Sequence, residues 1–167
     1  DFMMLWSDNL LADRLAGLAA RAAGYSPNIK GIEIIFRTLL AQFEIDDSKL
    51  VVADASGLSK KNKITAKLMG ELLYKIRKDE RYALLYESLP IGGVSGTLQS
   101  RFTTTAPSAV GLVRAKTGTL NGTATLAGYV QSTDREYVFV TLADDIAKGN
   151  AALNKARAAI DRVLGRI

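Results

Sequence analysis

The sequence contains no histidine and no cysteine among its 167 residues. Without cysteine, the chain has no disulfide framework, no zinc ribbon, no iron–sulfur cluster and no cysteine nucleophile. Without histidine, it has no Ser-His-Asp triad and no histidine general base, so lysine, carboxylates, tyrosine and hydroxyl groups remain to move protons. Any hydrolase of this composition therefore needs a lysine-type base.

Long apolar runs and concentrated charge are also missing. No apolar run approaches the ~20 residues that a bilayer-spanning helix needs. The chain has 22 basic and 17 acidic residues, a net charge of +5, and its densest basic cluster, residues 60–63, is typical of a solvated turn. We therefore expect no nucleic-acid partner, and a salt-dependent affinity for DNA is the observation that would support that distant alternative.

Hydrophobic residues make up 48% of the chain and charged residues 23%, which is typical of a folded globular domain. Helical periodicity predicts helices over residues 9–23, 31–43, 66–78, 82–88 and 149–164. Alternation predicts strands over residues 111–117, 123–132 and 136–142, the last two joined by a hairpin. Because residues 137–140 are apolar on both faces, we expect layers on both sides of the sheet. The pattern predicts an α/β fold, an α/β/α sandwich around an antiparallel sheet.

Two short motifs are candidates for chemistry. Lys116-Thr117-Gly118-Thr119 sits at the end of a predicted strand, and its glycine lets another group approach the backbone closely; taken alone, it is explained as a strand end. Ser7-Asp8-Asn9, taken alone, is explained as a helix cap. Together with Ser-x-x-Lys, however, Ser-Asp-Asn and Lys-Thr-Gly form the signature set of penicillin-binding proteins and class A β-lactamases.

Four blocks in the chain make the similarity more specific. They are Ser7–Asp13, Asp54–Ser59 with Asn62 and Thr65, Leu89–Leu98 with Arg101-Phe102, and Ala115–Gly122 with Leu126–Tyr129. In this order they resemble class C low-molecular-mass penicillin-binding proteins, which are D-alanyl-D-alanine carboxypeptidases and endopeptidases. The resemblance covers nearly the whole chain and implies a penicillin-binding, transpeptidase-like fold.

The resemblance also implies a reaction. In this family the serine of Ser-x-x-Lys attacks the carbonyl between two D-alanines, its lysine acts as base, and an acyl-enzyme forms. The implied partners are peptidoglycan peptides ending in D-Ala-D-Ala and β-lactam antibiotics. An exported enzyme of the periplasm or cell-wall space is expected, with membrane attachment left open and with no cofactor and no metal.

The same resemblance assigns roles to the two motifs. Ser7 relays a proton to the leaving amine, Asn9 holds the substrate amide, and Lys116 binds the terminal carboxylate and tunes nearby pKa values. The Lys-Thr-Gly segment adds carboxylate-binding hydroxyls and a backbone oxyanion donor. Its substrate-binding residues are Thr117, Gly118 and Thr119.

The sequence departs from the family in one respect: no serine is followed three places later by lysine. We therefore expect residues 1–167 to be the C-terminal portion of a transpeptidase-like catalytic domain, with the nucleophile on an upstream segment of the same protein. This chain alone is then expected to be inactive. Whether the whole enzyme is a carboxypeptidase or an endopeptidase stays open.

Two alternatives remain. A class A β-lactamase deacylates with a glutamate-activated water and usually carries Glu-x-x-x-Asn, which does not occur here. A non-catalytic fragment or scaffold module of the same fold is the other alternative. Retention of Ser7, Asn9, Lys116 and Thr119 argues against a decayed site in the parent protein.

Overall fold

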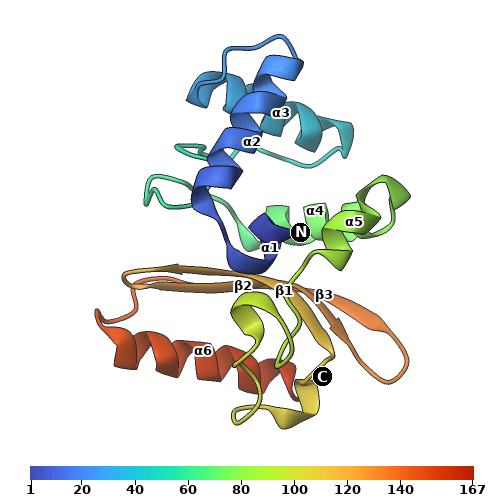
Figure 1. Ribbon diagram of the computed structural model, residues 1–167, viewed down its shortest axis with the longest axis vertical. Coiled ribbons are helices and arrows are strands. Elements are labelled where there is room, and N and C mark those ends of the chain that lie inside the picture. Colours follow the sequence, from blue (N-terminus) through green and yellow to red (C-terminus); the bar gives the residue numbers. More distant parts are fainter. The chain divides into compact units, whose positions relative to one another are not determined.

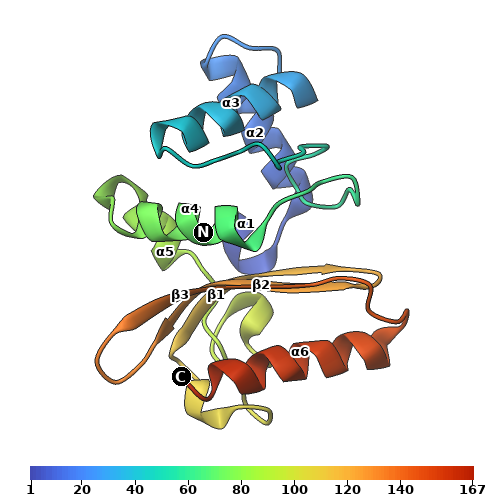
Figure 2. The same cartoon turned by 180° about the vertical axis from the view of Figure 1, so that it is seen from behind.

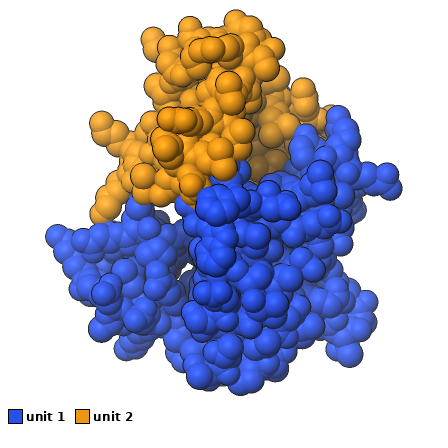
Figure 3. Space-filling model, in the orientation of Figure 1, with its two compact units in different colours: residues 1–7, 76–167 blue, residues 8–75 orange.

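The computed structural model describes all residues from 1 to 167. They form two compact units (Figure 3). The first, here called the sheet unit, contains residues 1–7 and 76–167. The second, the helical unit, contains residues 8–75. The boundary between the units therefore falls inside Ser7-Asp8-Asn9.

The sheet unit is built on an antiparallel sheet with the strand order β1-β2-β3. The strands are β1 (Val113–Leu120), β2 (Thr123–Gln131) and β3 (Glu136–Ala143). Helix α6 (Asn150–Leu164) lies on one face, and α1 (Phe2–Trp6) and α5 (Ala83–Glu87) lie on the other (Figures 1 and 2). The predicted α/β fold with helices on both sides of an antiparallel sheet is confirmed.

The register of the sheet decides which side chains share a face. Lys116 is opposite Ala127, and Thr117 is opposite Leu126. Because side chains alternate along a strand, Thr117 shares the face of α6 with Leu126, and Lys116 points to the opposite face. The two parts of the Lys-Thr-Gly motif therefore lie on opposite faces of the sheet.

The apolar core of the sheet unit lies between the sheet and α6. Phe102 and Leu98 are among its fully buried side chains and come from the loop region before β1. The buried core residues are Leu98, Phe102, Ala106, Ala109, Val113, Ala115, Leu126, Val130, Ile160 and Leu164. Three short 3-10 helices, η1 (Glu80–Tyr82), η2 (Gly96–Leu98) and η3 (Pro107–Ala109), shape the connecting segments.

Two details of the predicted sheet were wrong. First, β1 runs to Leu120, because the hairpin turns only at Asn121-Gly122 and Leu120 still pairs with Thr123. The Lys-Thr-Gly motif is therefore inside a strand and not at its end. Second, residues 137–140 are not fully buried: Tyr137 is 40% exposed. The central strand β2 is buried along its α6 face and, on the other face, at Tyr129, whereas β3 is the last strand of this sheet.

The helical unit begins at Asp8. It contains α2 (Asn9–Ala22), α3 (Ile29–Gln42) and all but the last two residues of α4 (Ala66–Arg77). Each helix has a side-chain N-cap: Asp8 accepts from Leu11 N at 2.8 Å, Asn28 from Gly31 N at 3.1 Å, and Thr65 from Leu68 N at 3.1 Å. These caps accept hydrogen bonds from backbone N–H groups that have no partner within the helix. Within Ser7-Asp8-Asn9, Asp8 is the residue that caps α2.

The loop between α3 and α4 is ordered by side chains bonding to the backbone. The Asp54 carboxylate accepts from Gly57 N at 2.7 Å and from Ser59 N at 2.6 Å. Asn62 Nδ2 donates to Asp54 Oδ1 at 2.7 Å, and its Oδ1 accepts from Ala53 N at 2.7 Å. This block of the sequence is thus a turn built on Asp and Asn side chains. None of the helices in either unit has the length and apolarity to cross a membrane.

Candidate active site

Lys116 and Ser7 form a direct contact within the sheet unit. Lys116 Nζ donates to Ser7 Oγ at 2.6 Å and to the backbone oxygen of Thr117 at 3.1 Å. Burial lowers the pKa of the Lys116 ammonium, because desolvation penalises the charged form. The structure therefore joins the first residue of one motif to the first residue of the other.

Ser7 is held at this place by the end of α1. It is the C-cap of that helix, with left-handed backbone angles of φ 60° and ψ 48°, and its N–H donates to Met3 O. Helix α1 contacts η2 at Gly96, where a Cβ would lie 2.5 Å from the Leu5 carbonyl oxygen. Gly96 also has a positive φ of 54°. The absence of a side chain at position 96 therefore lets α1 approach and fixes the Ser7 hydroxyl beside Lys116.

On its outer edge, the first part of β1 pairs with residues 90–92. Ala115 N donates to Pro90 O at 3.0 Å, and Val113 O accepts from Gly92 N at 2.9 Å. Backbone groups alternate in direction along a strand, so odd-numbered residues of β1 point away from β2. The next residues of β1 whose backbone groups point outward are Thr117 and Thr119. They lie beyond the part of the strand that pairs with residues 90–92. The outer edge of β1 thus presents N–H and C=O groups to an extended ligand.

The hydroxyls of Thr117 and Thr119 have partners from outside the strand. Thr117 Oγ1 lies 2.9 Å from Thr97 Oγ1 in η2, and either atom can be the donor. Thr119 Oγ1 accepts from Arg157 Nη2 of α6 at 2.9 Å. Sequence reasoning gave no role to Thr97 or Arg157. Thr97 belongs to one of the four sequence blocks. Arg157 belongs to none of them, and its contact with Thr119 depends on how α6 packs against the sheet, which no sequence pattern indicates.

Gly118 is required by the neighbouring strand. A Cβ at this position would collide with the Thr125 hydroxyl, which faces it across the β1–β2 ladder. The close approach expected at this glycine is therefore made by Thr125.

Asn9 lies in the other unit. It is the first residue of α2, directly after the Asp8 cap, and it is partly exposed. The structure thus brings together Ser7, Lys116 and Thr117 in the sheet unit, with Thr119 on the same strand, and describes Asn9 in the helical unit.

On the Lys116 face, a polar network ties all three strands to α5. Glu136 accepts from Arg77 Nε and from the Tyr86 hydroxyl, both at 2.7 Å. Two guanidinium groups contact the Tyr86 ring, that of Arg77 at 4.0 Å and that of Arg114 at 5.2 Å from the ring centroid. It also packs edge-on against Tyr129 at 5.1 Å. Burial raises the pKa of Tyr129 to about 12, with small further effects from Arg77 and Glu136.

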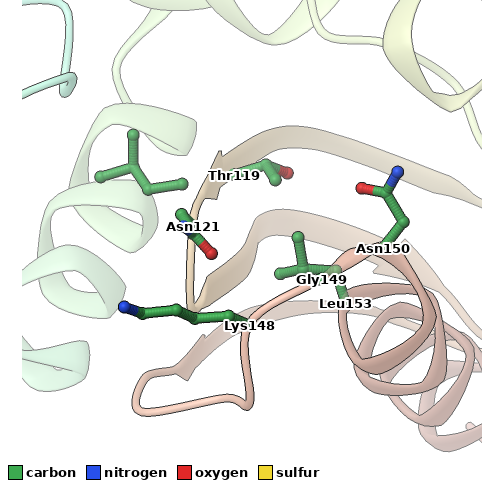
Figure 4. A pocket seen from close by; sticks show the side chains of 7 residues that line it. Thr119, Asn121, Lys148, Gly149, Asn150 and Leu153 are labelled. Carbon is green, nitrogen blue, oxygen red and sulfur yellow. The ribbon is translucent and has the colours of Figure 1, made fainter.

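An open hollow of about 450 Å³ lies at the far end of β1 (Figure 4). It is lined by Thr119, Leu120, Asn121, Lys148, Gly149, Asn150 and Leu153. Its lining contains no histidine, cysteine or acid, and no group of three or more such side chains gathers in the structure. The hollow therefore extends the Thr119 end of the strand but offers no residues suited to a metal ion.

Comparison with known proteins identifies relatives of this chain. Carboxypeptidase DacB of Mycolicibacterium smegmatis is 39% identical over 145 residues, which cover 84% of this chain and 31% of the relative. D-alanyl-D-alanine carboxypeptidase DacB of Haemophilus influenzae is 34% identical over 160 residues, which cover 93% of this chain and 33% of the relative. The chain thus spans about a third of the length of these curated relatives.

The fold agrees with the sequence matches. The crystal structure of penicillin-binding protein 4 (dacB) from Haemophilus influenzae superposes with a TM-score of 0.88 and 30% identity, covering 99% of this chain and 38% of that one. The same protein has also been solved in complex with a β-lactam. The model of the D-Ala-D-Ala carboxypeptidase 3 (S13) family matches residues 1–167. The four sequence blocks, the fold and the family match agree, and the chain belongs to the D-Ala-D-Ala carboxypeptidase 3 (S13) family.

Proposed function

We propose that this chain supplies the carboxylate-binding and proton-relay side of the active site of a serine-type D-alanyl-D-alanine carboxypeptidase or endopeptidase. The observation that carries the proposal is the 2.6 Å contact between Lys116 Nζ and Ser7 Oγ beside the outer edge of β1. Membership of the S13 family supports it. The substrates are peptidoglycan peptides ending in D-Ala-D-Ala, and β-lactams occupy the same site.

In this proposal the substrate lies extended along the outer edge of β1. The outward N–H of Thr119 donates to the oxyanion, a type of contact whose loss costs ~3 kcal/mol in other hydrolases. The terminal carboxylate binds near the hydroxyls of Thr117 and Thr119 and in the positive potential of Lys116. Gly118 allows the strand to keep this path, and Asn9 holds the substrate amide through its side chain.

The proton relay follows from the donors and acceptors. The Lys116 ammonium can only donate, so Ser7 Oγ accepts from it and the Ser7 proton is left to point elsewhere. When the amide bond breaks, Ser7 gives that proton to the departing D-alanine nitrogen and takes one from Lys116. The lowered pKa of Lys116 makes this second transfer easier.

The nucleophile is proposed to come from elsewhere in the protein. None of the serines here has a lysine one helical turn later, the spacing that puts both side chains on one helix face. An upstream segment with Ser-x-x-Lys supplies the serine and its base, and residues 1–167 form the C-terminal portion of that catalytic domain. Because D-Ala-D-Ala peptides belong to peptidoglycan, the proposed location is outside the cytoplasm, in the periplasm or cell-wall space.

Mass spectrometry after treatment with a labelled penicillin tests this division of labour. The 167-residue chain alone is expected to form no covalent adduct, and the protein that also contains the upstream segment is expected to carry the adduct on that segment. An acyl group on Ser7, Ser56 or Ser59 would overturn the proposal. No adduct on the complete protein would favour the non-catalytic scaffold instead.

Lys116→Ala in the complete enzyme tests the carboxylate site. Acylation by penicillin is expected to slow by about 100-fold, because hydrogen bonds from charged groups are worth ~1.5–3 kcal/mol. Lys116→Arg is expected to recover only part of the rate, since a guanidinium fork does not fit a site shaped for a compact ammonium. Lys148→Ala, which removes a lysine from the neighbouring hollow, is the matched control. Equal rates for Lys116→Ala and the control would remove Lys116 from the site.

A further inference from the structure

Arg157 of α6 determines which way the Thr119 hydroxyl can donate. Arg157 Nη2 donates to Thr119 Oγ1 at 2.9 Å, and Nη1 donates to Asn154 Oδ1 at 3.2 Å. A guanidinium carries only donors, so Thr119 Oγ1 must be the acceptor of this bond. The single proton of the Thr119 hydroxyl is therefore left for another acceptor.

The backbone of α6 is anchored at the same residue. Arg101 Nη2 donates to the Arg157 carbonyl oxygen at 3.2 Å and also forms an ion pair with Asp161. Both side chains of this pair are buried, with exposed fractions of 13% for Arg101 and 4% for Asp161. Thr105 Oγ1 adds a hydrogen bond to Asp161 at 3.0 Å. Arg101, singled out in the sequence together with Phe102, thus holds the helix turn that carries Arg157.

The hydroxyls of Thr117 and Thr119 differ in whether the direction of their hydrogen bond can reverse. The partner of the Thr117 hydroxyl is another hydroxyl, that of Thr97, and either atom can donate. The direction of that bond can reverse when a ligand arrives. The Arg157–Thr119 bond cannot reverse, and it also brings a positive charge next to the hydroxyl. A hydroxyl that accepts from a guanidinium is a better donor to an anion, because the two hydrogen bonds polarise each other.

We propose that Arg157 is a positioning residue that fixes the Thr119 hydroxyl as a donor to the terminal carboxylate of the ligand, so that the enzyme favours ligands with a free carboxylate over neutral ones. This inference rests on the function proposed above. It adds to that function a source of specificity on α6, outside the four sequence blocks. Arg157 does not touch the ligand; it acts through Thr119.

The test compares the acylation rate of the complete enzyme by a penicillin and by the methyl ester of the same penicillin. Arg157→Gln is expected to lower the rate with the free acid by about tenfold and to leave the ester rate within about twofold. Arg157→Lys, which keeps the charge and loses the fork, is expected to fall between wild type and Arg157→Gln. Asn154→Ala removes the other partner of the guanidinium and is expected to keep the wild-type ratio of acid to ester.

A double-mutant cycle supplies a second measurement. In a Thr119→Val background, Arg157→Gln is expected to cause no further loss with the free acid, because its effect passes through the hydroxyl. Equal falls with acid and ester, for both Arg157 variants, would mean that Arg157 has only a structural role and would overturn the inference.

The outcomes separate this inference from the proposed function. A wild-type enzyme that is not acylated by the penicillin overturns the proposed function, and the inference with it. A wild-type enzyme that is acylated, with Arg157→Gln and Arg157→Lys equal to it in their acid-to-ester ratios, overturns the inference alone.

Discussion

The sheet unit is built around one continuous apolar core, whereas the helical unit contains two small apolar clusters and a polar loop. In the sheet unit, Phe102, Leu126 and Ile160 belong to a single cluster that joins the loop region, the sheet and α6. In the helical unit, Ile32 of α3 packs in one cluster with α2, and Leu40 and Leu68 belong to a second. Asp54 and Asn62 organise the loop between α3 and α4 through hydrogen bonds.

This difference matters for the candidate site. Lys116, Thr117 and Thr119 lie on β1, and residues that share the α6 face of the sheet with Thr117, such as Val113 and Leu126, are fully buried. Packed cores resist displacement because any shift opens voids or creates overlaps. Side chains for carboxylate binding and proton transfer must be held to within fractions of an ångström. The better-packed unit is therefore the one that carries most of the candidate chemistry.

The largest expected effect comes from the buried ion pair of the sheet unit. Asp161→Ala leaves Arg101 buried without its carboxylate and is expected to lower the free energy of unfolding by ~3–5 kcal/mol. Asp134→Ala, which breaks an exposed Arg–Asp pair in the same unit, is expected to cost ~1 kcal/mol or less. Denaturant titration of both variants measures the difference. Similar losses for the two would contradict the buried pair's role, and the double variant Arg101→Met, Asp161→Leu is expected to regain stability.

A smaller effect is expected where α1 meets η2. Gly96→Ala forces a left-handed alanine against the Leu5 carbonyl and is expected to shift α1, moving Ser7 away from Lys116. Gly111→Ala has the same kind of backbone strain, with a φ of 79°, but nothing lies within 4 Å of its Cβ. Strain alone costs ~1–2 kcal/mol, and the overlap is expected to add roughly 1–3 kcal/mol at Gly96.

Penicillin acylation of the complete enzyme separates the two glycine variants. Gly96→Ala is expected to slow acylation by about tenfold or more, and Gly111→Ala to leave it near wild type. A Gly111→Ala variant that lost as much activity as Gly96→Ala would show that strain, and not the position of Ser7, is responsible.

The helical unit is expected to respond to the loss of a single carboxylate. Asp54→Ala removes the acceptor for Gly57, Ser59 and Asn62 and is expected to destabilise the loop by ~1–3 kcal/mol. Asp46→Ala, which removes an acceptor for Ser48 alone, is the control. Amide hydrogen exchange is expected to speed up within residues 53–62 and to stay unchanged in β1–β3. Equal acceleration in the strands would mean that the two units unfold together.

The smallest effect is confined to alkaline pH. Burial raises the pKa of Tyr129 from 10.0 to about 12, so between these values the folded state keeps a proton that the unfolded state has lost. Stability from this group is complete below pH 10 and is lost as the pH rises toward 12. Tyr129→Phe is therefore expected to flatten the fall of the melting temperature over this range.

The periodicity of the sequence was enough to predict the larger helices and the three strands. Helix α2 illustrates why: Asp8 caps it and the apolar residues after it repeat at helical spacing, so local signals agree. Helix α1 was not predicted, because five residues are too few to show a periodicity. The end of β1 was misplaced because Thr119 and Leu120 belong to the strand only through their partners in β2.

The sequence by itself determined the family resemblance, the candidate residues Ser7, Asn9, Lys116 and Thr119, and the exclusion of histidine and cysteine chemistry. These depend on residue identity and order along the chain, which local patterns record. Only the tertiary structure decided that Lys116 contacts Ser7, that α1 packs closely against Gly96, and that Arg157 donates to the Thr119 hydroxyl. Each of these contacts joins segments far apart in sequence, and their distances are set by how a helix packs on a sheet, which no local pattern encodes.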